Sequence, residues 1–363
     1  MAHKGMRYLL VILMGLGLVI GCVLLEALVG KKGQEALEQN DSSKVFEDGE
    51  VTKTGQELSK TILYEDEEFV CYEDRVISHF YYKEANTTRI ATMVEGILEY
   101  CPDLNHVYVV PVPHRILVEE GYEEDKETYQ KYMEQLFMQL PEKGILVPTL
   151  TVLENHKDEY IFFHTEDAWT AKGAYYGTEA LCNEMGLEPI PLEQYREYMY
   201  TSFRGGLVLK ENMDHVDDEG LEDRTYYYLL PETPNMVEVV GEDNLGNKVT
   251  YKKPIITSSA RNLGSFIQSI YTRAIVEGDP QDTKNEGKYL LVVCDGAGRI
   301  MVPYLKDYYE GVYVINMREE DELSHDLNEI VKEYYISDVL FAQSAMEMGV
   351  PGYSRALNDF CEE

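Results

Sequence analysis

Short apolar runs alternate with longer amphipathic stretches over most of this chain. The runs are rich in Val, Ile and Leu and nearly free of polar positions, which is typical of strands buried on both faces of a parallel sheet. The alternation predicts a three-layer α/β domain with a mostly parallel sheet. The predicted strands are residues 107–112, 145–150, 289–294, 312–315 and 339–342, and the predicted helices are residues 88–100, 126–140, 172–185, 299–308 and 322–334.

Residues 203–256 follow a different pattern. Three strand-like runs occur there, at 226–230, 236–240 and 248–251, and the Gly- and Asn-containing stretch 241–246 is suited to a turn between the last two. We expect a small antiparallel, β-rich insertion in the α/β domain, placed near the mouth of any functional site.

The N-terminus carries an uncharged apolar run from Tyr8 to Leu25, flanked by Lys4 and Arg7 before it and by Lys31 after it. As a helix this run is about 27 Å long, enough for a bilayer core of roughly 30 Å. We therefore predict a membrane segment in residues 1–32. An uncleaved anchor is favoured over a cleaved signal peptide and over a lipoprotein signal ending at Cys22. Because basic residues flank both ends, charge leaves the orientation open.

Two further parts follow the membrane segment. Residues 33–59 are polar and nearly free of aromatic side chains, so we expect an acidic stalk that does not fold alone. Residues 60–363 are long enough to bury one substantial core, and they form the predicted α/β domain.

Charge and cysteine usage exclude several functional classes. With 66 acidic and 32 basic residues the chain has a formal charge of −34, which disfavours nucleic acid as a partner. Six cysteines without a close pair give neither a disulfide framework nor a zinc site, so we expect them to be buried packing residues. No metal or cofactor is predicted.

Candidate chemistry is concentrated in two stretches, residues 164–176 and residues 289–296. The first reads Thr165-Glu-Asp-Ala-Trp-Thr170 and then Gly-Ala, and the second is an apolar strand that ends in Asp295-Gly296. The first resembles the signature of the DHHW family, exported proteins of Gram-positive bacteria related to alginate O-acetyltransferases and SGNH hydrolases. That signature is Thr-Asp-His-His-Trp-Thr followed by Gly-Ala. The second resembles the family's strand that ends in Asp-Ser.

The resemblance implies an SGNH-like fold whose catalytic groups are lost. Glu166 stands where the family has the Asp that orients the base, and Ala168 stands where it has the His that acts as base. Asp295 is retained, but Gly296 takes the place of the nucleophilic Ser. Because neither a methyl group nor a glycine can accept a proton or attack a carbonyl, the simplest inference is a pseudoenzyme.

The resemblance covers residues 61–341. The hydrophobic stretches 107–113, 302–305, 312–318 and 336–341 follow the family's order, whereas Phe203-Arg-Gly-Gly-Leu207 is a worn version of its Phe-Tyr-Gly-Ser block. A retained hydrophobic frame with altered polar positions indicates a conserved fold and changed chemistry. By resemblance, the domain lies outside the cell membrane.

Two interpretations of the candidate residues remain open. In one, they line a cleft at the carboxyl ends of the strands. In the other, Trp169 packs in the core, Thr170 caps the following helix and the acids are solvated. The ligand-binding candidates are His164, Glu166, Asp167, Trp169 and Asp295.

Other chemistries are disfavoured. A phosphate cradle at residues 296–298 lacks the spacing and the Lys of a nucleotide loop. A cysteine nucleophile at Cys294, paired with His164, conflicts with strand alternation, and Ser258 or Ser259 offers no better case. Glu166, Asp167 and Asp295 would hold a divalent cation only if they converge.

The sequence therefore predicts a single-pass membrane protein whose α/β domain is extracellular, catalytically inactive and binds a cell-envelope ligand such as a polysaccharide. One alternative is an active carbohydrate esterase or O-acetyltransferase with relocated catalytic residues. Another is a structural partner of envelope proteins without a small-ligand site.

Overall fold

The computed structural model describes residues 58–209, 221, 223–242, 248–256, 263–267, 273–316 and 327–350. All of them belong to one compact unit, residues 48–363. Within these ranges no helix is long and apolar enough to cross a membrane. The predicted anchor at residues 1–32 and nearly all of the predicted stalk lie outside the described residues, so both stay predictions.

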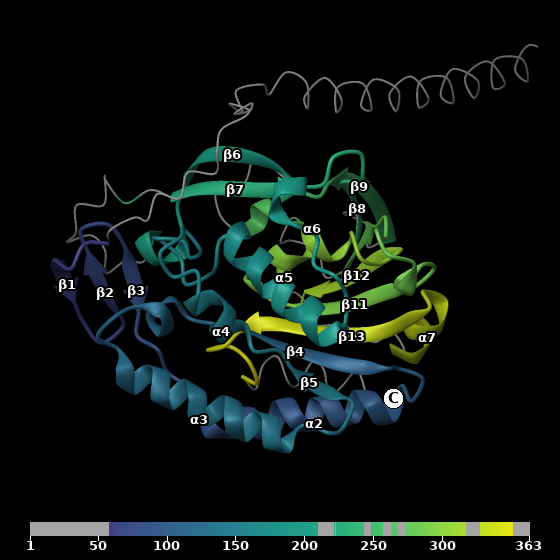
Figure 1. The fold of residues 1–363 in the computed structure, drawn as a ribbon, viewed down its shortest axis with the longest axis horizontal. Coiled ribbons are helices and arrows are strands. Elements are labelled where there is room, and N and C mark those ends of the chain that lie inside the picture. The colour runs from purple at the N-terminus through teal and green to yellow at the C-terminus, as the bar shows by residue number, and fades with distance from the viewer. Residues whose placement is uncertain are drawn as a thin grey trace, which may run out of the picture. The chain divides into compact units, whose positions relative to one another are not determined.

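An eight-stranded sheet forms the centre of the domain (Figure 1). Its order is β5-β4-β13-β11-β12-β10-β8-β9, and neighbouring strands from β5 to β12 are parallel. The remaining three pair antiparallel with their neighbours. The strands are β4 (His106–Val112), β5 (Gly144–Leu146), β8 (Met236–Glu242), β9 (Lys248–Pro254), β10 (Arg273–Glu277), β11 (Tyr289–Cys294), β12 (Gly311–Asn316) and β13 (Ile336–Ser344).

Strand β11 shows why the parallel strands are continuous apolar runs. Leu290, Val292 and Cys294 face one buried cluster and Leu291 and Val293 face the other, because successive side chains of a strand point to opposite faces. Helices cover both faces. One face carries α2 (Glu84–Tyr100), α3 (Glu123–Gln139) and α7 (Leu327–Glu333), and the other carries α4 (Thr149–Glu154), α5 (Ala171–Met185) and α6 (Val302–Leu305).

Two smaller sheets flank the main one. β1 (Ile62–Glu65), β2 (Phe69–Tyr72) and β3 (Val76–Ser78) form an antiparallel sheet that the sequence pattern did not reveal. β6 (Arg196–Phe203) and β7 (Asp223–Leu229) form a two-stranded hairpin.

The three-layer α/β prediction is confirmed, and three details are corrected. The sheet is mixed, because β8 and β9 of the predicted insertion extend the main sheet through β10 instead of forming a separate lobe. The predicted strand 145–150 stops at Leu146, since Pro148 cannot donate to a ladder, and α4 begins at Thr149. The predicted helix 299–308 is only a 3₁₀ turn, η7 (Gly298–Met301), followed by α6.

Candidate functional site

The first candidate stretch forms a tight turn that leads into α5. Phe162 bridges Trp169, and the Phe163 amide donates to the Ala168 carbonyl at 3.1 Å. The Thr170 hydroxyl accepts from the amide of Gly173 at 3.3 Å, so Thr170 caps α5. The indole of Trp169 is fully buried. The side chains that remain at the surface of this turn are therefore Glu166 and Asp167.

Asp295 links the end of β11 to the turn that follows it and to the end of β13. One carboxylate oxygen accepts from the amides of Ala297 (3.0 Å) and Gly298 (2.9 Å), and the other accepts from the amide of Ser344 at the end of β13 (2.8 Å). The residue is 2% exposed. Asp295, which the sequence suggested as a ligand-binding residue, thus uses both carboxylate oxygens to accept from backbone amides. These hydrogen bonds fix the geometry of the turn at Gly296.

Gly296, which follows Asp295 at the end of β11, is bordered by two side chains. A Cβ added at Gly296 would lie 3.3 Å from Leu263 Cδ1 and 3.8 Å from Arg299 Nη2. The Arg299 guanidinium donates to the Leu263 carbonyl at 3.3 Å, which ties the two together. A side chain at this position would require Leu263 Cδ1 to shift by a few tenths of an ångström.

The worn block 203–207 packs directly against the first stretch. Phe203 stacks on Phe163 with ring centroids 4.2 Å apart, and the amide of Gly205 donates to the Thr165 hydroxyl at 2.8 Å. A Cβ at Gly205 would lie 2.0 Å from the Thr165 carbonyl oxygen, so the approach requires glycine. The amide of Gly206 then donates to Glu166 Oε2 at 2.7 Å, which orients this carboxylate.

Asp167 forms a compact cluster with two residues that sequence reasoning missed. Its Oδ1 lies 3.0 Å from His114 Nε2, and its Oδ2 accepts from the Ser78 hydroxyl at 2.6 Å. Ser78 Oγ is also 3.1 Å from His114 Nε2. Burial raises the pKa of Asp167, but the charge and hydrogen bonds of His114 and the hydrogen bonds of Ser78 outweigh it, so the pKa lies below its usual range. The carboxylate is ionised near neutral pH.

The arrangement of protons distinguishes this cluster from a nucleophilic triad. The Ile116 amide donates to His114 Nδ1 at 3.3 Å, so the proton of a neutral imidazole is on Nε2 and points at Asp167. In a triad the histidine accepts from serine through one nitrogen and donates to the acid through the other. Here one nitrogen faces both groups, and both protons converge on Asp167. The cluster therefore joins β3 to the first stretch, and the imidazole of His114 is not placed to accept the proton of Ser78.

Asp223 of β7 is a second residue without a sequence signal. It is 2% exposed, and one of its oxygens accepts from the Tyr160 hydroxyl (2.5 Å) and the His164 amide (2.7 Å). The other accepts from both the amide and the hydroxyl of Thr165. His114 could have been found from the sequence, because it follows a predicted strand and so lies at the carboxyl edge of the sheet. Ser78 and Asp223 could not, because they are far from both candidate stretches along the sequence.

His164 is 9% exposed, and its ring meets Tyr160 edge-on at 5.2 Å. Burial and the charge of Arg115 lower its pKa to about 4. Because the unfolded chain binds this proton near pH 6.5, stability is unaffected above that pH, falls as the pH drops towards 4, and levels off below it. At pH 5 we expect the domain to be about 2 kcal/mol less stable than at pH 7 through this residue.

The measurement is urea unfolding at both pH values for the unmodified chain and for His164→Phe, which keeps an aromatic ring but cannot titrate. The difference between the two pH values should shrink by about 2 kcal/mol in the variant. His106→Phe, whose side chain is 43% exposed, is the control and should keep the full difference. Equal pH dependence in all three proteins would contradict the argument.

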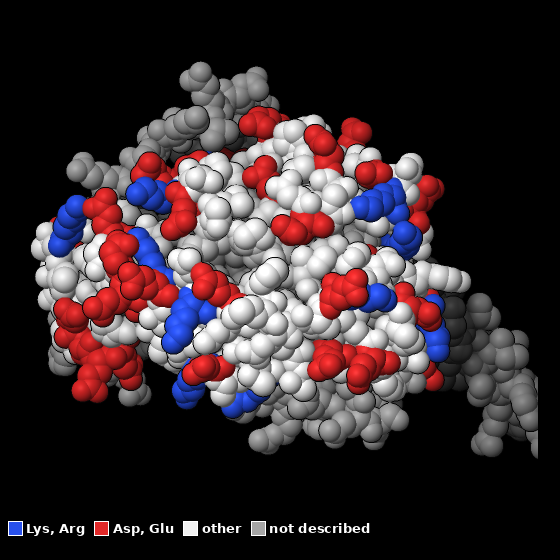
Figure 2. Space-filling view, turned by 60° about the horizontal axis from the view of Figure 1, so that its bottom comes forward, with Lys and Arg blue, Asp and Glu red and all other residues white. Residues whose placement is uncertain are grey.

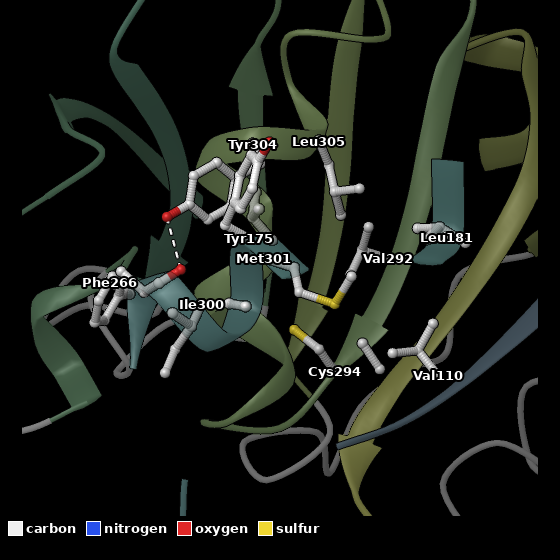
Figure 3. Close-up of a cluster of buried hydrophobic side chains, with 14 of the residues drawn as sticks. Val110, Tyr175, Leu181, Phe266, Val292, Cys294, Ile300, Met301, Tyr304 and Leu305 are labelled. Carbon is white, nitrogen blue, oxygen red and sulfur yellow. Dashed lines mark hydrogen bonds between the residues drawn. The ribbon is translucent and has the colours of Figure 1, made fainter. Parts of the chain in front are cut away.

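Cys294 points into the apolar core (Figure 3), among side chains that include Val292 and Met301. It is fully buried, and burial raises the pKa of its thiol to about 12. A thiol in this state is a poor nucleophile. Cys71, Cys101 and Cys182 are buried as well, and none of the three forms a disulfide within the described residues. Ser258 and Ser259 lie outside the described residues.

The three acids do not form a cation site. Asp295 is engaged by backbone amides, Asp167 by His114 and Ser78, and Glu166 by Gly206. In the part of the chain that the structure describes, no three metal-ligating side chains converge. The surface nearby is acidic. Figure 2 shows Asp and Glu side chains spread over one face of the domain, most densely at its left end.

Residues 143–315 match the sequence model of the DHHW family, described as DHHW protein. A DHHW family protein from Eubacterium siraeum has a similar fold, with a TM-score of 0.64 and 20% identity over 80% of this chain and 94% of that one. Bacillus cereus PatB1, solved alone and with a sulfonyl adduct, has a TM-score of 0.60 and 15% identity, covering 78% of this chain and 98% or 97% of PatB1. No curated protein matches the sequence. At these identities the structural likeness establishes the fold.

Proposed function

We propose that this chain, whose residues 143–315 match the model of the DHHW family, is a member of that family and that its α/β domain is a binding module that has lost acyl-transfer chemistry. The observation that carries the proposal is the environment of Gly296, where Leu263 and Arg299 border the space that a serine side chain would need. Ala168, in the place of the base, is 2% exposed and carries no titratable group. Neither step of acyl transfer has a residue to perform it at these positions.

The ligand we propose is a cell-envelope polysaccharide without net negative charge. Glu166 and Gly296 are half-buried, Gly206 is exposed, and Arg299 lies directly beneath. Oriented carboxylate and peptide groups of this kind suit hydroxyl-rich ligands. The formal charge of −34 repels polyanions, which favours a neutral glycan. The proposal includes a membrane anchor at residues 1–32 with the domain on the outer side.

A second candidate function is an esterase in which Ser78 attacks the ester. The 3.1 Å distance between Ser78 Oγ and His114 Nε2 favours it. It ranks below the binding module because the imidazole proton faces Asp167, and because Ser78 is only 8% exposed. The two candidates differ in a single measurable property, turnover of an ester.

The first test is hydrolysis of 4-nitrophenyl acetate by the full chain, purified in mild detergent. We expect no rate above that of buffer, and none in Ser78→Ala or Cys294→Ala. Turnover that disappears in Ser78→Ala would contradict the binding module and establish the esterase. A restored variant combines Gly296→Ser with Ala168→His and is compared with and without Leu263→Ala, because the added Cβ lies 3.3 Å from Leu263.

The second test is binding to an array of neutral and acidic glycans. We expect retention of a neutral glycan, weakened about tenfold by Glu166→Gln, a change equivalent to about 1.4 kcal/mol. Glu188→Gln is the matched control, because Glu188 is exposed and lies after α5, away from the first stretch. Failure to retain any glycan would count against a binding module and favour a structural role in an envelope assembly.

A further inference from the structure

A fully buried ion pair lies immediately after α6, outside the site described above. The side chains of Lys306 and Asp307 are both 0% exposed, with Nζ and Oδ1 2.5 Å apart. Lys306 Nζ also donates to the Thr233 hydroxyl at 2.8 Å. Their carbonyls accept from the amides of Asp279 (3.1 Å) and Gln281 (3.0 Å), so main-chain bonds fix both residues.

The hydrogen bonds of this pair do not account for all its polar atoms. An ammonium group has three donors, and Lys306 uses two of them, on Asp307 and Thr233. Asp307 Oδ2 has no hydrogen-bond partner among the described residues. The nearby Thr233 hydroxyl donates to the Leu230 carbonyl at 3.2 Å, and it also lies close enough to Asp307 to lower the pKa of that carboxyl, which burial raises to about 6. A buried carboxylate oxygen is rarely left in this state, because its desolvation is uncompensated.

We infer that Lys306 and Asp307 bind one ordered internal water molecule. The guest must accept a hydrogen bond from the third Lys306 donor and donate one to Asp307 Oδ2, which only an amphoteric molecule can do. A cation would face the ammonium group and an anion would face the carboxylate, so neither ion fits. Water needs two to four polar partners in such a place, and these two groups supply the minimum.

Tyr195 is another buried polar group whose environment includes Asp307. Its hydroxyl is buried and has no partner among the described residues. Burial, and next the negative charge of Asp307, raise the pKa of Tyr195, which places the two groups within electrostatic reach of each other. A tyrosine hydroxyl can donate to the same water that donates to Asp307.

The water has a consequence for the architecture. Thr233 lies in the turn between β7 and β8, and Lys306 follows α6, which begins six residues after Gly296. Leu305, just before Lys306, points into the apolar cluster of Figure 3. With the water in place, the hydrogen bonds of Lys306 and Asp307 are complete, and they hold the β7–β8 turn against the segment after α6.

The experiment is a crystal structure of the full chain at about 2 Å resolution or better. We expect a density peak within about 2.7–3.2 Å of both Asp307 Oδ2 and Lys306 Nζ. A side chain or main-chain donor on Asp307 Oδ2 in place of the peak, or no peak at all, would overturn the inference. An ion with non-water coordination distances would do so as well.

A variant gives an independent readout in solution. In Lys306→Met with Asp307→Leu, which has a similar volume and no charge, the peak should vanish and amide exchange at Glu232, Thr233 and Asn235 should quicken at least tenfold. The matched control is Glu310→Gln, an exposed residue close by. Unchanged exchange in the double variant would argue against a pinning role for the water, and a retained peak would show that other groups hold it.

Discussion

Replacing Trp169 with alanine should destabilise the α/β domain by about 3–5 kcal/mol, the range for removing a large aromatic side chain from a packed core. Trp169 is 0% exposed, and its ring lies where a Cβ on Gly177 would come within 2.5 Å. Its indole nitrogen donates to the Ala297 carbonyl at 2.9 Å. The side chain thus joins the first candidate stretch, α5 and the turn after β11.

The measurement is urea unfolding of the full chain followed by far-UV circular dichroism, because Trp169 is the only tryptophan and its fluorescence is lost with it. Trp169→Phe separates packing from hydrogen bonding. It keeps much of the apolar volume but leaves the Ala297 carbonyl without its donor, so a loss of about 1–3 kcal/mol is expected. Phe137→Ala, on a side chain exposed at 68%, is the control for nonspecific effects. A loss below about 1 kcal/mol in Trp169→Ala would contradict the structure.

Asp223→Asn should cost about 3–5 kcal/mol, although the substitution barely changes the shape of the side chain. The carboxylate accepts four hydrogen bonds, from Tyr160, His164 and both donors of Thr165. An amide group has one acceptor oxygen, and its NH₂ would face donors at the other position. Two charge-assisted bonds are lost and a donor–donor contact is created.

Arg224→Ala is the matched control for Asp223→Asn, because Arg224 is the next residue on β7 and is exposed. It should change the free energy of unfolding by less than about 0.5 kcal/mol. If Asp223→Asn were equally mild, the β6–β7 hairpin would not be what holds the first stretch in place. A selective loss of glycan binding without unfolding would instead assign Asp223 to the site itself.

Three residues of the two candidate stretches have structural roles that need no catalysis. The two carboxylate oxygens of Asp295 accept from backbone amides at the ends of β11 and β13. Trp169 fills the core, and Thr170 caps α5. Ala168 and Gly296 carry no polar side-chain group, so neither contributes a side-chain hydrogen bond to this frame.

The local pattern of apolar residues was sufficient to predict strands and helices whose buried positions form an unbroken run or a helical stripe. The predicted strands at β4, β11, β12 and β13, and the predicted helices at α2, α3 and α5, are confirmed. A run of apolar residues predicts a buried strand whatever its neighbours are, and helical spacing predicts a buried helix face. The sheet β1–β3 was missed because its strands have only three or four residues, too few to show a period.

By itself the sequence determined what chemistry is missing at the family's positions. Glycine and alanine carry no reactive group in any fold, so Gly296 and Ala168 exclude a nucleophile and a base there. Only the tertiary structure decided what surrounds those positions. It brought Ser78 and His114 to Asp167, Asp223 to Thr165, and Leu263 to Gly296, and it attached β8 and β9 to the main sheet. These contacts join residues tens of positions apart, and the free energy that selects them comes from burial and hydrogen bonding in the assembled core, which no local pattern contains.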